Sequence, residues 1–135
     1  MRVMKYALVV SAFLFIYVAS KFPAPGPPPS QQFQLAIAFV GLMNVVAGCV
    51  LPQLIVQSTQ RRFPNPPPEM QLARWRLKGI LSLAFFEACV LFGFVIKFLH
   101  GIAWLSALLF AVGIAAELLW NPGKPPGMDG EFPRG

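Results

Sequence analysis

Four long apolar runs constrain this chain more than any other feature of its sequence. They cover residues 6–18, 33–56, 80–98 and 102–120. A helix needs about 20 apolar residues to cross the hydrocarbon layer of a bilayer, and the last three runs are close to or above that length. Because lipid offers no hydrogen bonds, every backbone N–H and C=O must be satisfied within its own segment, as in a helix. The sequence therefore predicts an all-α integral membrane protein.

The composition favours lipid over water as the solvent. Apolar residues make up 56% of the chain and charged residues only 12%, whereas about 25% of the residues of a soluble domain are charged. The net charge of +6 would also suit nucleic acid. The basic residues flank the apolar runs, however, as they do beside membrane spans. We therefore expect contact with a lipid bilayer and none with nucleic acid.

Proline-rich segments separate the runs and set the helix ends. The proline clusters lie in residues 23–29 and 64–68, and such stretches favour extended spacers. Glu69 follows the second cluster, and both a proline and an acid suit the first turn of a helix. We expect one four-helix bundle over residues 1–120 and a disordered tail over 121–135, because the tail is rich in Pro and Gly. The predicted helices cover residues 3–22, 33–56, 68–99 and 102–120.

The first run has two interpretations. Its basic start, with Arg2 and Lys5, and the sequence Val18-Ala19-Ser20 at its end are also typical of a signal peptide with a small-residue cleavage site. We favour an uncleaved helix, because residues 3–22 can span a bilayer if the flanking lysines reach back to the interface. The cleaved signal peptide stays open as the alternative.

The distribution of Lys and Arg predicts the orientation. If the N-terminus is cytoplasmic, nine of the 11 basic residues face the cytoplasm and only Lys21 and Lys97 face the far side. Lys and Arg in short loops set the orientation of membrane helices. We therefore expect both termini in the cytoplasm, in the inner membrane of a bacterium. The basic residues on the cytoplasmic side are Arg2, Lys5, Arg61, Arg62, Arg74, Arg76, Lys78, Lys124 and Arg134.

Glu87 is the most informative polar residue. It lies within the third run, roughly 10 Å beyond the expected cytoplasmic edge at ~1.5 Å per residue. A carboxyl at such depth costs free energy, and an intramembrane ionisable group is a functional candidate by default. It carries a proton or ion, forms a structural hydrogen bond between helices, or contacts a ligand or pigment. The expected interhelical partner is Asn44, on the same helix face as Gly41 and Gly48, which would let another backbone approach closely.

Other residues suggest anchoring and packing. Ala103, Ala107, Ala111 and Ala115 recur every four residues, as in a close-packing helix face. This stripe could meet the protein's own helices or a partner. Glu117 lies near the end of the fourth run, and we expect it to reach the interface or to pair with Lys78. The expected interface anchors are Arg74, Trp75, Arg76, Lys78 and Trp120.

No sequence motif indicates a reaction. There is no glycine-rich phosphate loop and no paired-cysteine or histidine cluster. Cys49 and Cys89 lie inside apolar runs and are expected to be reduced packing residues. His100 is expected to be solvated, and Asp129 lies in the tail. We therefore predict a protein that is not an enzyme, without a catalytic residue, a metal site or a cofactor.

The segment Glu87-Ala88-Cys89-Val90-Leu91-Phe92-Gly93-Phe94-Val95-Ile96 resembles the carboxylate-bearing helix of the proteolipid c subunit of rotary ATP synthases. In that family two helices form a hairpin with a basic cytoplasmic loop, which Arg61 and Arg62 would supply here. The resemblance implies that Glu87 carries an ion. The chain departs from that family in its longer proline-rich loop and its two extra helices. It is also similar to small four-helix bacterial membrane proteins, a likeness that implies no activity.

Three functions are compatible with the sequence. The first is a non-catalytic accessory or structural subunit of a larger membrane complex, which the small size and the alanine stripe favour. The second is a proton- or ion-handling protein that uses Glu87. The third is a small transporter with Glu87 in its binding pocket. Expected partners are the bilayer and either other membrane subunits or further copies of this chain.

Overall fold

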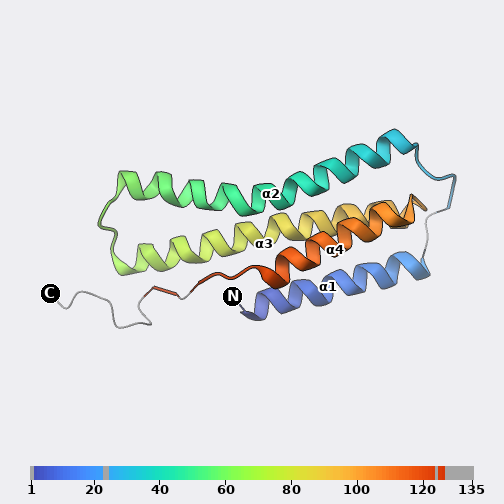
Figure 1. The fold of residues 1–135 in the computed structure, drawn as a ribbon. Coiled ribbons are helices and arrows are strands. Elements are labelled where there is room, and N and C mark those ends of the chain that lie inside the picture. Colours follow the sequence, from blue (N-terminus) through green and yellow to red (C-terminus); the bar gives the residue numbers. More distant parts are fainter. Residues whose placement is uncertain (1, 23–24, 124, 127–135) are drawn as a thin grey trace.

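Four helices and the turns between them make up the computed structural model of this chain, as Figure 1 shows. The structure describes residues 2–22, 25–123 and 125–126, and within them there is no strand. The all-α prediction with four helices is confirmed. Most of the expected tail, together with Asp129, lies outside the described residues. The helices are α1 (Arg2–Lys21), α2 (Gln31–Arg62), α3 (Pro68–Phe98) and α4 (Ala103–Leu119).

Three of the helices, α1, α2 and α3, are long and apolar enough to cross a membrane, and α4 is a shorter apolar helix. With 32 and 31 residues, α2 and α3 are about 48 and 46 Å long at ~1.5 Å per residue. With 20 and 17 residues, α1 and α4 are only about 30 and 25 Å long. One end of the α2–α3 hairpin therefore extends beyond α1 and α4 (Figure 1).

The helix ends follow from local sequence. α3 starts at Pro68 with Glu69 in its first turn, as the sequence predicts. α2 ends at Arg62 rather than at residue 56, because its polar last turns contain no helix breaker before Pro64. At its start, the Ser30 side chain accepts a hydrogen bond from the backbone N–H of Phe33, which satisfies one of the free donors of a first turn.

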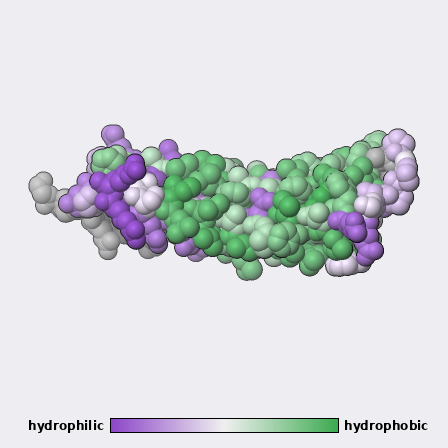
Figure 2. Space-filling model, turned by 90° about the horizontal axis from the view of Figure 1, so that it is seen from above, coloured by the Kyte–Doolittle hydropathy of each residue, from purple (hydrophilic) through white to green (hydrophobic). Residues whose placement is uncertain are grey.

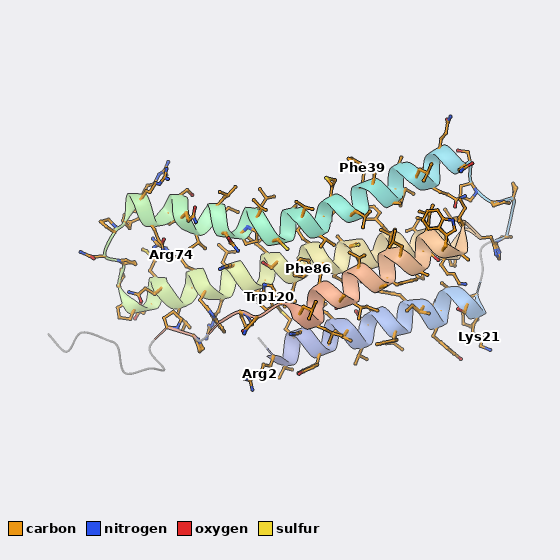
Figure 3. The ribbon with its side chains drawn as sticks, in the orientation of Figure 1. Arg2, Lys21, Phe39, Arg74, Phe86 and Trp120 are labelled. Carbon is orange, nitrogen blue, oxygen red and sulfur yellow. The ribbon has the colours of Figure 1, made fainter. Side chains whose placement is uncertain are left out.

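The central element is α3, which contacts all three other helices. Glycines allow the close approach: a Cβ at Gly48 would lie 2.8 Å from a ring carbon of Phe86, and one at Gly113 would lie 2.5 Å from Val90 Cγ2. Ser82 Oγ also donates to Gly48 O at 2.9 Å. Phe86 is fully buried at the centre of this packing (Figure 3). α4 also contacts α2, since a Cβ at Gly41 would meet Leu109, so α2, α3 and α4 share one core.

Polar side chains connect neighbouring segments at each end of α4. At one end, the buried Gln34 Nε2 donates to Pro29 O at 2.8 Å, and its Oε1 accepts from Ile102 N. At the other end, Lys5 Nζ donates to Trp120 O at 2.8 Å and to Leu118 O. Lys5 thus satisfies carbonyl groups at the C-terminal end of α4, which are left free in any helix and favour a cation.

The surface is divided into a hydrophobic middle and polar ends, as Figure 2 shows. Many large apolar side chains are exposed, among them Phe13, Phe39 and Trp104. An apolar surface of this extent on a soluble monomer would cause association, whereas lipid would cover it without cost.

Candidate functional site

The Glu87 carboxyl lies where α1, α3 and α4 meet. Ser11 Oγ, from α1, is 2.6 Å from Glu87 Oε1 and donates a hydrogen bond to it. The other oxygen, Oε2, is buried and has no hydrogen-bond partner in the described residues. A buried polar atom without a hydrogen-bond partner costs free energy. We therefore expect Oε2 to carry a proton or to contact a ligand.

A second carboxyl, that of Glu117 on α4, lies against Glu87. The Glu117 side chain is 0% exposed, and its carboxyl lies beside that of Glu87. Neither of its oxygens has a donor among the described residues. Glu87 and Glu117, which we call the carboxyl pair, are therefore two acids in contact inside an apolar bundle.

The helix faces explain why these residues meet. On α4, the buried positions Ser106, Phe110, Gly113 and Glu117 are spaced by three or four residues, which places them on one side of the helix. This is the side that packs on α3, since a Cβ at Gly113 would touch Val90. Glu117 is one turn after Gly113, so its carboxyl enters the same helix contact.

Sharing a proton is the chemistry that this arrangement allows. Two carboxyl groups form a hydrogen bond with each other only when one of them carries a proton, because an ionised carboxylate is an acceptor only. Two negative charges this close would also repel each other strongly at low dielectric. The arrangement therefore suits a pair of carboxyls that share one proton, and Ser11 supplies a hydrogen bond to the Glu87 side of the pair.

The pair is open on one side. A groove of about 360 Å³ lies between α1 and α3, and its only titratable lining residue in the described part of the chain is Glu87. The other lining residues are Met4, Leu8, Ile80, Leu83, Ala84, Ala88 and Leu91. We call it the lateral groove. Glu87 lines the lateral groove, which opens on the apolar surface. Glu117 does not line the groove and is fully buried.

The surroundings of the pair are apolar. Cys89, close to Glu117, is buried and is a free thiol that donates to Leu109 O at 3.5 Å. Cys49 is free and exposed. Within residues 2–22, 25–123 and 125–126, no three His, Cys, Asp or Glu side chains come together as metal ligands would.

Two expectations about partners are corrected. Asn44 Nδ2 donates to Val40 O of its own helix at 2.8 Å, and Ser11 rather than Asn44 is the hydrogen-bond partner of Glu87. The reason is that α2 packs on another side of α3. Glu117 neither reaches the interface nor pairs with Lys78, because it is fully buried beside Glu87.

The predicted packing residues fall into two groups. Gly41 and Gly48 are buried, and a Cβ at Gly41 would lie 2.9 Å from Leu109 Cδ2. The alanine stripe, by contrast, is exposed on the outer side of α4 and makes no part of the described core. Its members are Ala103, Ala107, Ala111 and Ala115.

Four of the predicted anchors lie in the first turns of α3, near the α2–α3 loop, whereas Trp120 follows α4 and lies nearer the middle of the bundle (Figure 3). Trp75 Nε1 donates to Pro122 O at 2.7 Å, which holds the segment after α4 against α3. Arg74 is half-buried between the ends of α2 and α3 (Figure 3). Arg76 is exposed, while Lys78 and Trp120 are half-buried.

The sequence predicts Glu87 but neither of its two neighbours. Ser11 is a small hydroxyl residue in an apolar run, which is common on packed membrane helices. Its position opposite Glu87 depends on how α1 packs. Comparison with protein-family models, with curated proteins and with solved structures gave no significant match for this chain.

Proposed function

We propose that this chain is an integral membrane protein that takes up and releases a proton, or handles a cation, at the carboxyl pair. The observation that carries the proposal is the contact between Glu87 and the fully buried Glu117. Intramembrane carboxyls are costly and commonly belong to proton relays. A purely structural role would be met by a single amide or hydroxyl, without two acids that must share a proton.

The membrane placement belongs to the same proposal. Three helices have the length and composition of spans, and the apolar middle of the surface matches a bilayer (Figure 2). The excess of basic residues on the side of the α2–α3 loop supports a cytoplasmic position for that loop and for both termini. The lateral groove would then face lipid, and Glu87 would be reached from the bilayer.

Proton flux in vesicles tests the function. The full chain is reconstituted into vesicles with an internal pH dye, and a potassium gradient with valinomycin drives protons inward. We expect acidification with the natural chain and a loss of at least about tenfold in Glu87→Gln, because an amide cannot exchange a proton with Glu117. Glu69→Gln is the matched control, since Glu69 is exposed in the first turn of α3.

Two results would count against proton handling. One is equal flux in the natural chain and in Glu87→Gln. The other is the absence of flux above empty vesicles in the natural chain, with the protein shown to be folded and inserted. In either case the carboxyl pair is a structural contact between α3 and α4.

A second candidate function is a non-catalytic subunit of a larger membrane complex. The observation that favours it is the alanine stripe, which lies exposed on α4 although small residues normally let helices approach each other. Native mass spectrometry after gentle detergent extraction distinguishes the two. Foreign subunits at fixed stoichiometry support the subunit function, whereas a monomer or a pure homo-oligomer opposes it.

A further inference from the structure

A groove unrelated to the carboxyl pair lies at the end of the α2–α3 hairpin. Its volume is about 630 Å³. It is bordered by the last turns of α2, the proline-rich loop, the first turns of α3 and Pro126 of the C-terminal segment. We call it the basic groove. Its lining residues are Val56, Gln60, Pro64, Pro66, Gln71, Arg74, Trp75, Lys78 and Pro126.

The charges of the basic groove are of one sign. Arg74 and Lys78 line it, and none of its described lining residues is acidic. The two cations are four residues apart on α3, so they point to the same side of the helix. Gln60 and Gln71 add neutral amide donors from opposite walls. The groove therefore favours an anion with several acceptor oxygens.

Arg74 is held in place by protein groups but keeps free donors. Its Nη2 is 3.3 Å from Thr59 O and 3.4 Å from Met70 Sδ, and these are the hydrogen bonds it makes within the described residues. Its Nε is buried without a partner. A guanidinium carries five N–H donors in a rigid fork that matches phosphate. The bond to Thr59 orients the fork while other donors remain for a ligand.

The position of the groove selects the kind of anion. Trp75 lines it, and tryptophan is enriched at the level of lipid headgroups. Val56, the last residue of the apolar run of α2, also lines the groove, so the groove adjoins the apolar part of that helix. Basic pockets between membrane helices on the cytoplasmic side bind anionic headgroups. We propose that the basic groove binds the phosphate headgroup of an anionic glycerophospholipid whose chains continue along the apolar helices.

The experiment uses the full chain in detergent micelles, with phosphatidylglycerol and phosphatidylcholine as probes, read by native mass spectrometry. We expect the natural chain to retain one phosphatidylglycerol in preference to phosphatidylcholine. In Arg74→Gln/Lys78→Gln the preference should fall at least about tenfold, because each basic residue near the headgroup contributes to attraction. Arg61→Gln/Arg76→Gln removes the same charge from exposed residues outside the groove, and its preference should stay near that of the natural chain.

Each alternative result overturns the proposal. An equal loss in both double variants means general attraction to a basic surface, and no loss in either means that the groove is not a lipid site. Displacement of the lipid by millimolar glycerol 1-phosphate means a site for soluble phosphate esters.

Since Arg74 also supports the α2–α3 contact, Lys78→Gln alone serves as a milder variant and should show a smaller loss in the same direction. Thermal unfolding verifies that each variant is folded. The result does not depend on the carboxyl pair, because Glu87 and Glu117 stay intact throughout.

Discussion

At the scale of single residues, the two members of the carboxyl pair differ in access. Glu87 borders the lateral groove, while Glu117 is 0% exposed. A hydrophobic carbodiimide enters from lipid and modifies protonated carboxyls. We therefore expect peptide mass spectrometry to find the adduct on Glu87 and not on Glu117. Modification should fall in Ser11→Leu, whose larger apolar side chain covers Glu87. Preferential labelling of Glu117 would show that the groove is not the route of entry.

The positions of Glu87, Glu117 and Asn44 differ in how well the sequence predicts them. Glu87 stands out because a charge in the middle of an apolar run is costly wherever the helices pack. Glu117 lies near the end of its run, where a carboxyl could equally turn to the interface, and only the packed face of α4 decides between the two. The sequence also predicts Asn44 beside Glu87, because Asn44 shares a helix face with Gly41 and Gly48, yet the direction in which α2 faces α3 separates the two residues.

At the scale of helices, the contact between α3 and α4 depends on the missing side chain of Gly113. A Cβ there would lie 2.5 Å from Val90 Cγ2 and 3.2 Å from the backbone oxygen of Phe86. Gly113→Val should therefore destabilise the protein by about 1–3 kcal/mol, the usual cost of overpacking, as measured by thermal unfolding in detergent. Ala111→Val adds apolar volume to the exposed side of the same helix and should leave the midpoint nearly unchanged. Equal midpoints in the two variants would contradict this packing.

The helices themselves were the most predictable part of the fold. Apolar length and proline position are local properties, and α3 begins at the expected Pro68. The end of α2 was misplaced because its last turns are polar and resemble a loop, although nothing in them prevents a helix. Which helices touch is not local: the order of packing around α3 depends on glycines such as Gly48 and Gly113 meeting the right partners.

At the scale of the whole molecule, the orientation in the membrane decides which water phase lies nearer the carboxyl pair. The side of the α2–α3 loop carries most of the Lys and Arg residues, which predicts that it is cytoplasmic. In a chain with Cys49→Ala and Cys89→Ala, we introduce either Asn65→Cys in this loop or His100→Cys in the opposite turn, both at exposed positions. A membrane-impermeant maleimide added to intact cells should label the variant at residue 100 and reach residue 65 only after lysis. The opposite pattern would reverse the orientation and place the basic groove on the far side, away from the anionic cytoplasmic leaflet. Equal labelling at both positions would mean that the chain inserts both ways, which the uneven distribution of basic residues opposes.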